Sequence, residues 1–413
     1  MKDQDRAAYE SSDTVAAEHG EHMETPEETG EGFAEETLKG ISPEKDTDPA
    51  EARAEANGTS GAARVGIMTF LHNGNYGSSL QAYALQRVIR EMGFDCEHID
   101  WQPDVKEKIR NLIRCGNSPK LLLEGRRKRQ VQAVQEGMRQ KRQRILGFYG
   151  RRMKLSPVCR NYGELWKNAE RYDILLCGSD QIWNPVWLNT AYFLDFAEPA
   201  KKRIAYAASL GVSRVPGRRK QRMIRRRTAL FDAVSVREEE GARVMVSITG
   251  NRPPVMPDPV CLLTRTEWEQ VMVPLEKREP FLLCYFIGEN PAYWDRVREV
   301  SGKTGLTPLV IPVTADSYAR EEYEKLDGAG PEEFLSAVAG AEMICTDSFH
   351  GLALGTIFEK KVDLIYRDRE GDRESKNSRV EHFLRENRNK GLENMRTEGL
   401  NWLMEQLGCG ENQ

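Results

Sequence analysis

The chain has 413 residues, of which 39% are hydrophobic and 30% charged, and its formal net charge is −4. This length suggests two folded domains with additional segments, because single domains usually contain about 100–200 residues. No apolar run approaches the ~18 residues of a membrane span, and the N-terminus lacks the basic and apolar parts of a signal peptide. Neither a membrane-spanning protein nor a secreted precursor is expected.

Residues 1–62 are predicted to form a disordered acidic tail. Residues 1–60 contain 17 Asp and Glu against 5 Lys and Arg, a net charge of −12, which leaves +8 for the rest of the chain. A segment with so much charge and so few aliphatic residues cannot bury enough apolar surface to offset the entropy lost on ordering.

This tail should be dispensable for folding. We expect limited proteolysis to remove it quickly and to leave a stable core that begins near Ala62, because proteases cut exposed, disordered chain first. A protease-resistant tail, or a truncated chain that fails to fold, would contradict this prediction.

The eight cysteines show no CxxC pair and no spacing typical of a metal site. Cys177, Cys284 and Cys345 lie within apolar runs, where a free cysteine behaves as a small hydrophobic residue. This pattern is typical of reduced thiols in a cytoplasmic protein, and no metal site is predicted.

The folded part is expected to begin with a β–loop–α–β unit. "RVGIMTF" and "FDCEHIDW" are predicted strands, and "LQAYALQRVIREMG" between them has apolar residues at helical spacing and a glycine at its end. This order implies a parallel sheet. The loop "LHNGNYGSS" lacks the dinucleotide-binding glycine pattern, but Asn75, Gly77 and Ser78 could hold an anion at the helix start; a plain tight turn is the alternative.

A strongly basic segment follows, with 16 Lys and Arg against 3 Asp and Glu between residues 106 and 154. It has few aromatic residues and no nucleic-acid-binding module, so no nucleic-acid partner is expected. We interpret it as a helical insertion at about residues 105–155. It would form a pair of solvated helices that cover a cleft where an acceptor substrate binds. A basic face could also draw the protein to anionic glycans or, peripherally, to the inner face of the membrane.

Polar residues follow the predicted strands of the rest of the chain. "DILLCG" precedes Asp180 and Gln181, and "AVSV" precedes Arg237, which is followed by three glutamates. In the second half, "FLLCYFIG", "LTPLVIPV" and "EMICTD" are strands separated by predicted helices. The expected fold is α/β, with domains at residues 63–262 and 263–395 facing each other across a cleft, and a C-terminal helix and tail at residues 396–413. Ligands bind at the carboxyl edge of such sheets.

The stretch "CTDSFHGLALG" places His350 at a sharp corner between a strand and a helix. Gly351 leaves room for a ligand against the backbone. Asp347 could hold the imidazole in orientation, or it could cap the helix, which we favour. The histidine itself could be a structural residue rather than a functional one.

Five stretches occurring in order resemble the polysaccharide pyruvyl transferase family: "NYGSSLQAYALQ", "GSDQIWNP", "SVREEEG", "TDSFHGLALG" and "NSR". The resemblance runs from about Arg64 to about Gly391. It implies a fold like that of GT-B glycosyltransferases, with two Rossmann-like domains. It also implies phosphoenolpyruvate as the donor substrate, no further cofactor, and a glycan or lipid-linked sugar as the acceptor of a pyruvate ketal.

The resemblance also implies roles for particular residues. His350 corresponds to the histidine that acts as general acid, and Arg237 to an arginine that holds the donor. Family members carry an arginine two positions before the histidine, where this chain has Ser348. The donor would then need Arg237, the helix start after His350, and Arg379 or Lys376. The remaining predicted substrate-binding residues are Ser348, Asn75, Gly77, Ser78, Asp180 and Gln181.

A histidine titrates near ~6.5, so it can protonate the methylene carbon of phosphoenolpyruvate at neutral pH and make the neighbouring carbon electrophilic. Arginines and backbone N–H groups suit the phosphate and the carboxylate. Two alternatives stay open. One is a nucleotide-sugar glycosyltransferase on the same fold, and the other is a non-catalytic member of the polysaccharide machinery, which the missing arginine favours.

Overall fold

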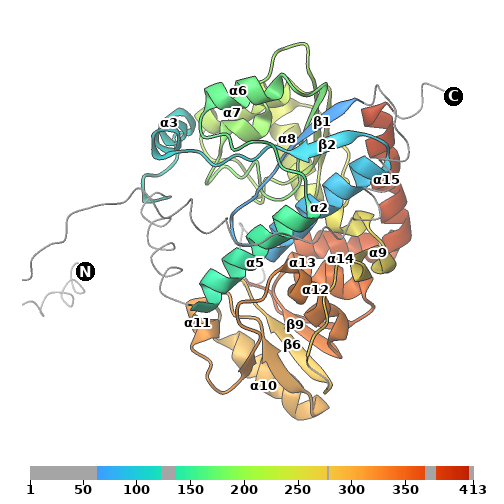
Figure 1. Cartoon of the computed structure of the whole chain (residues 1–413). Coiled ribbons are helices and arrows are strands. Elements are labelled where there is room, and N and C mark those ends of the chain that lie inside the picture. Colours follow the sequence, from blue (N-terminus) through green and yellow to red (C-terminus); the bar gives the residue numbers. More distant parts are fainter. Residues whose placement is uncertain (1–62, 122–135, 277–278, 368–377, 409–413) are drawn as a thin grey trace, which may run out of the picture. The chain divides into compact units, whose positions relative to one another are not determined.

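The computed structural model describes residues 63–121, 136–276, 279–367 and 378–408. All of them belong to one compact unit, Thr47–Gln413. The predicted acidic tail and Lys376 lie outside the described residues. Within these, the chain forms two five-stranded parallel sheets with the orders β2-β1-β3-β4-β5 and β10-β9-β6-β7-β8 (Figure 1). The predicted fold class, α/β with two Rossmann-like sheets, is confirmed.

The first sheet is formed by short, buried and largely β-branched or aliphatic strands, as its central position between helices requires. Its strands are β1 (Arg64–Met68), β2 (Asp95–His98), β3 (Ile174–Cys177), β4 (Lys202–Ala208) and β5 (Ala233–Val236). Its helices are α2 (Tyr76–Glu91), α3 (Val105–Cys115), α5 (Glu136–Arg152), α6 (Tyr162–Ala169), α7 (Arg218–Thr228) and α8 (Glu239–Thr249), with 3-10 turns at Thr190–Phe193 (η1) and Pro259–Leu262 (η2).

The second sheet follows the same alternation. Its strands are β6 (Phe281–Tyr285), β7 (Thr307–Val310), β8 (Glu324–Lys325), β9 (Met343–Thr346) and β10 (Lys361–Leu364). The helices are α9 (Arg265–Glu269), α10 (Ala292–Thr304), α11 (Ala315–Tyr318), α12 (Pro331–Gly340), α13 (Phe349–Ile357), α14 (Ser378–Lys390) and α15 (Leu392–Leu407). The two-residue strand β8 is too short to give a sequence signal and was not predicted.

Helix α2 begins earlier than the sequence pattern indicated. Its first residue is Tyr76, and Asn75 caps it by accepting a hydrogen bond from the Gly77 N–H at 2.8 Å. Gly77 and Ser78 therefore lie in the first helical turn rather than in the preceding loop. The apolar periodicity that predicted a start at Leu80 misses this turn, because small and polar residues occupy it.

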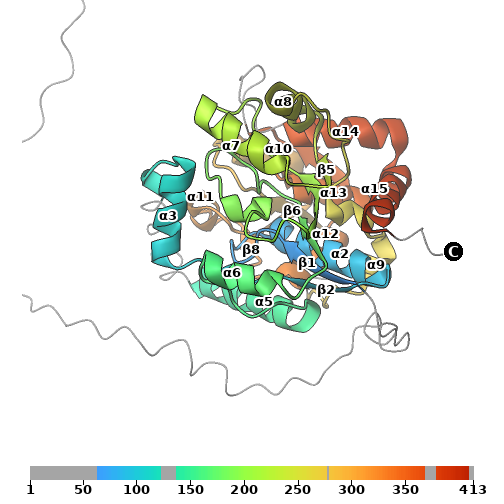
Figure 2. The same cartoon turned by 90° about the horizontal axis from the view of Figure 1, so that it is seen from above.

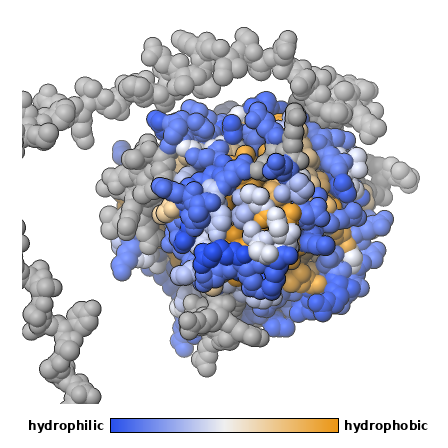
Figure 3. All heavy atoms as spheres, turned by 90° about the horizontal axis from the view of Figure 1, so that it is seen from below, coloured by the Kyte–Doolittle hydropathy of each residue, from blue (hydrophilic) through white to orange (hydrophobic). Residues whose placement is uncertain are grey.

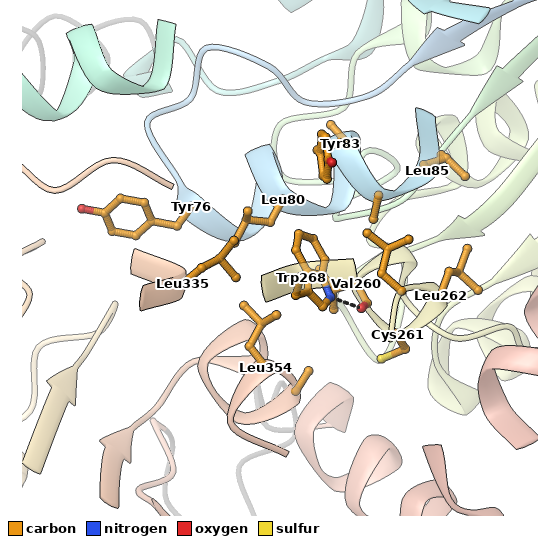
Figure 4. Close-up of a cluster of buried hydrophobic side chains, with 14 of the residues drawn as sticks. Tyr76, Leu80, Tyr83, Leu85, Val260, Cys261, Leu262, Trp268, Leu335 and Leu354 are labelled. Carbon is orange, nitrogen blue, oxygen red and sulfur yellow. Dashed lines mark hydrogen bonds between the residues drawn. The ribbon is translucent and has the colours of Figure 1, made fainter. Parts of the chain in front are cut away.

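One apolar core joins helices of both sheets. The face of α2 that carries Leu80 and Tyr83 packs over Trp268, whose indole N–H donates to the Val260 carbonyl at 3.1 Å (Figure 4). Leu335 of α12 and Leu354 of α13 belong to the same cluster. This packing holds the start of α2 against the second sheet, and it fixes the strand–helix corners from which the candidate site is built.

The basic segment is more than a solvated helical pair. Helix α5 buries Ile145, Phe148 and Tyr149 in the core. Its last turn forms ion pairs with the second half of the chain, where Arg152 lies 3.1 Å from Glu332. Helix α5 therefore bridges the two halves, whereas α3 lies at the edge of the molecule in both views of the ribbon (Figures 1 and 2).

The C-terminal helices return to the first sheet. Arg396 of α15 donates to the Leu262 carbonyl at 2.8 Å, and the rings of Trp402 and Tyr206 are 5.8 Å apart.

The view from below shows a face of mainly hydrophilic side chains with small apolar groups between them (Figure 3). Among the described residues, every helix is too short or too polar to span a bilayer.

Candidate functional site

His350 lies where the strand–helix turn after β9 of the second sheet contacts the start of α2, the helix that follows β1 of the first sheet. It is in the first turn of α13, directly after β9, and only 5% of it is exposed. Its ring rests against the backbone of Gly77 at the start of α2: a Cβ atom at Gly77 would lie 2.0 Å from His350 Nδ1. A glycine is required here because no side chain fits between the helix and the imidazole.

Gly77→Ala should therefore displace the imidazole. We expect this variant to lose about 1–3 kcal/mol of folding free energy from overpacking and to lower turnover by about 10²-fold. Gly150→Ala is the matched control, because nothing lies within 4 Å of a Cβ added at that exposed helical position. The control should gain up to ~1 kcal/mol and keep full activity, as measured by thermal unfolding and steady-state assay. Wild-type behaviour of Gly77→Ala would contradict this placement of His350.

The residues after β3 connect to the start of α2. The Ser78 hydroxyl donates to Asp180 Oδ2 at 2.5 Å and accepts from the Asn73 amide at 2.8 Å. Asp180 has a left-handed backbone (φ 65°), which non-glycine residues rarely adopt and which is found preferentially at functional sites. The structure thus brings together the predicted residues Ser78 and Asp180, while the Asn75 side chain serves as the cap of α2.

Arg237 is at the centre of a cluster of polar side chains that also contains Asp180, Asp258, Glu238 and His350. It follows β5, is 3% exposed, and donates from Nη1 to Asp258 Oδ2 at 2.5 Å. Its Nη2 lies 3.9 Å from Asp180, and its Nε lies 3.7 Å from Glu238. The guanidinium is also 5.0 Å from the ring centre of Phe349. The principal partner of Arg237 is therefore Asp258, rather than the glutamates that follow it at the start of α8.

Three buried nitrogens of this cluster have no hydrogen-bond partner among the residues that the structure describes. They are Nε and Nη2 of Arg237 and Nε2 of His350, which lies 3.6 Å from Asp258 Oδ2. Leaving a buried polar group unsatisfied costs about 1–3 kcal/mol, and more for a charged one. Such groups are rare in native proteins, and a catalytic role or a bound water or ion is among their explanations.

The charges of the cluster are strongly coupled. Burial alone would raise the pKa of the Asp258 carboxyl, but the charges of Arg237 and His350 hold it well below its usual range. Burial is likewise outweighed at Asp180, where Arg237, His350 and the Ser78 hydrogen bond lower the pKa. For Arg237 itself, Asp258 and the other carboxylates raise the pKa against the effect of burial. The cluster therefore holds a fixed guanidinium charge at neutral pH.

A second guanidinium stands beside the first. Burial and the positive charge of Arg237 lower the pKa of Arg379, in α14, to about 10. With its amide oxygen turned toward this guanidinium, Gln181 accepts from Arg379 at 3.0 and 2.6 Å. A pocket borders both arginines and Phe349, and α14 contributes His382 to its wall. A buried guanidinium (Arg237) beside a half-buried one (Arg379) is a favourable environment for an anion.

Neither suggested role of Asp347 is found. Its carboxylate accepts from the backbone N–H groups of Ile287 and Gly288, both at 2.7 Å, and from Tyr293 and Arg367. It therefore ties the loop after β6 to the corner after β9. The prediction that it caps α13 is wrong, because the side chain that follows it in the sequence reaches the helix N–H groups instead.

That cap is Ser348, whose hydroxyl accepts from the Gly351 N–H at 3.3 Å. Ser348 is fully buried, and its own N–H donates to Thr346 Oγ1 at 3.0 Å. The hydroxyl thus accepts from one of the helix N–H groups that we expected to be available for an anion. Ser348 is thus a structural cap at the position where the resemblance described above implied an arginine.

Asp258 and Glu238 are the members of the cluster that sequence reasoning did not assign to the site. Asp258 stands in the proline-rich stretch "PPVMPDPVCLL", which gives no catalytic spacing. Its carboxylate reaches Arg237, His350 and the Ser179 hydroxyl. It is placed there because residues 254–256, just before it, pair with Val236 at the end of β5. Glu238 stood out in the sequence only as one of the three glutamates after Arg237, but it is buried and accepts from the Ser209 hydroxyl at 2.7 Å.

No curated protein was found to match this chain. Among solved structures, UDP-GlcNAc 2-epimerase from Neisseria meningitidis is 10% identical, with a TM-score of 0.44, over 84% of this chain and 100% of that one. UDP-N-acetylglucosamine 2-epimerase from Rickettsia bellii is 9% identical, with a TM-score of 0.45, over 85% and 97%. The E. coli heptosyltransferase WaaC is 12% identical, with a TM-score of 0.35, over 78% and 99%.

Residues 75–369 match the model of the polysaccharide pyruvyl transferase family. The matched range begins at the cap of α2 and contains Asp180, Arg237, Asp258 and His350. Since the match covers well over half of the chain, the protein belongs to the polysaccharide pyruvyl transferase family.

Proposed function

We propose that this protein transfers the pyruvyl group of phosphoenolpyruvate to a sugar of a cell-surface or exported glycan and forms a pyruvate ketal. The observation that carries this proposal is the group of buried nitrogens of Arg237 and His350 that have no hydrogen-bond partner within the described part of the chain; both residues approach Asp258 Oδ2. A donor with a phosphate and a carboxylate would supply the missing acceptors. Membership of the family supports the same reaction class.

In this proposal the two arginines bind the donor. Arg237 presents Nε and Nη2 to one anionic group, while Nη1 stays bound to Asp258. Arg379 provides the second positive charge, in place of the arginine that the family pattern has at position 348. Burial and, after it, the charge of Arg237 lower the pKa of Arg379, and an anion between the two guanidinium groups would relieve their mutual repulsion.

His350 acts as general acid. It protonates the methylene carbon of phosphoenolpyruvate, and the adjacent carbon is then attacked by a hydroxyl of the sugar, whose proton returns to the imidazole. Phosphate leaves with the electrons of its C–O bond. A second hydroxyl then closes the ketal, and its proton leaves with the phosphate. Asp258 holds Arg237 and gives the protonated imidazole a negatively charged neighbour.

The proposal is tested by incubating the purified protein with phosphoenolpyruvate and a panel of nucleotide-activated and lipid-linked sugars. Phosphate release together with a product that has gained a pyruvyl group would support it. Release of a nucleoside diphosphate without phosphoenolpyruvate would instead indicate a glycosyltransferase. No release of either product, with binding of the sugar retained, would indicate a non-catalytic member of the family.

A further inference from the structure

Helix α3 has its polar face turned toward the protein. Glu107, which is 2% exposed, lies 3.4 Å from Arg114 on the same helix. Asn111 donates to the Leu188 carbonyl at 3.0 Å, and Arg114 donates to the Thr190 hydroxyl at 3.0 Å. These inward polar contacts attach the helix to the first sheet's loops through hydrogen bonds rather than through an apolar face.

The apolar residues of α3 point outward. Val105, Ile109 and Ile113 are 63%, 42% and 66% exposed, and their spacing of four residues aligns them along one stripe. A surface helix of a globular protein normally turns its apolar stripe to the core and its charges to water. In helix α3 the apolar stripe faces outward instead, so the described part of the chain leaves it open to an apolar environment outside the protein.

Basic residues flank this stripe. Lys106, Lys108 and Arg110 are exposed on α3, whereas the acidic residue of this helix, Glu107, is buried. Helix α7, which is also basic, lies beside α3, since its Arg219 donates to the Ile113 carbonyl at 3.0 Å. Helix α7 adds further exposed arginines, which are Arg218, Arg219, Arg222, Arg225 and Arg226. The stripe thus lies within a strongly positive surface.

A tryptophan stands at the border of the same surface. Trp187 is 43% exposed and lines, with Lys108 and Leu112, a hollow of about 140 Å³ beside α3. Tryptophan is enriched where a protein meets the boundary between lipid headgroups and acyl chains. An apolar stripe, flanking lysines and arginines, and a partly exposed tryptophan are the features of helices that lie in that boundary.

We propose that the α3 surface, defined as α3, the exposed arginines of α7 and Trp187, docks on an anionic lipid bilayer. The stripe enters the headgroup region and the basic residues contact the anionic headgroups. A lipid surface is favoured over a folded protein partner because the stripe is a single helix face with cations on both sides, which complements a flat anionic surface. This proposal does not depend on the reaction at His350.

The test is vesicle flotation of the full-length protein. We expect binding to vesicles of phosphatidylcholine and phosphatidylglycerol (about 7:3), little binding to pure phosphatidylcholine, and weakening of binding by salt. Ile109→Glu/Ile113→Glu should bind at least about tenfold more weakly, because the stripe can no longer enter the apolar layer. The affinity of Lys106→Glu/Arg110→Glu for anionic vesicles should fall by about fivefold for each basic residue replaced.

Leu146→Glu on α5 is the matched control, since Leu146 is also exposed (44%) but lies outside the α3 surface. It should bind vesicles as the wild type does. Equal thermal stability of all variants would show that they fold. The proposal is overturned if the wild type does not bind anionic vesicles, if it binds neutral ones equally, or if the α3 variants and the control behave alike. A change of oligomeric state in Ile109→Glu/Ile113→Glu, without loss of vesicle binding, would also overturn it.

Discussion

His350→Ala is expected to lower turnover by about 10²–10⁴-fold, the range that a general acid contributes, while phosphoenolpyruvate still binds. The imidazole lies against Gly77 and 3.6 Å from Asp258, and its Nε2 has no hydrogen-bond partner among the described residues, so its removal takes away a proton donor. Steady-state kinetics with saturating phosphoenolpyruvate measures the loss, and calorimetry measures donor binding.

His98→Ala is a suitable control for removal of a buried histidine. His98 is fully buried, bonds to the Ala82 carbonyl at 3.0 Å, and has a pKa lowered to about 4 by burial. Its loss should reduce stability but leave the turnover of folded protein unchanged. Near-normal turnover of His350→Ala would remove this histidine from the mechanism and would make the corner after β9 a structural feature.

Arg237→Lys should raise the Michaelis constant for phosphoenolpyruvate by about 10–100-fold with a much smaller loss of stability. The lysine keeps a positive charge beside Asp258 but lacks the planar fork that presents Nε and Nη2 to the donor. A hydrogen bond to a charged group is worth about 1.5–3 kcal/mol, which corresponds to this range. Kinetics at varied donor concentration and thermal unfolding measure the two effects.

Arg237→Met provides the contrast, because it leaves the buried Asp258 carboxylate unpaired and should cost about 3–5 kcal/mol of folding free energy. Arg243→Lys on α8 is the matched control: Arg243 is exposed and pairs with Glu239 and Glu240 at the surface, so neither quantity should change. If Arg237→Lys reduced stability and activity in parallel, Arg237 would be an ion-pair residue and not a donor-binding one.

The sheets could be predicted from the sequence because their strands are short apolar runs bounded by turns. "DILLCG", "AVSV" and "EMICTD" each correspond to a strand, and the polar residues after them meet as expected for carboxyl ends of parallel strands. Arg237, Asp180 and His350 were predicted as site residues in this way, and the structure places them in one cluster with Asp258. Their three-dimensional proximity follows from the packing of α2 on the second sheet, as the contact of Gly77 with His350 shows.

Other parts of the site leave no local signal. Asp258 reaches Arg237 because residues 254–256 pair with Val236 at the end of β5, and nothing in its neighbourhood of prolines indicates this contact. Asp347 was misjudged because adjacency to His350 in the sequence suggested contact, whereas its carboxylate points to the loop after β6. Side-chain direction at a strand end is set by the sheet and not by the next residue in the chain.

Calorimetric titration of phosphoenolpyruvate into the wild type and Arg237→Lys tests most directly whether the Arg237–His350 cluster binds this donor. We expect a single site in the wild type, affinity about 10–100-fold lower in Arg237→Lys, and no comparable heat with UDP-N-acetylglucosamine. Absence of phosphoenolpyruvate binding in the wild type, or equal affinity in the two proteins, would contradict it.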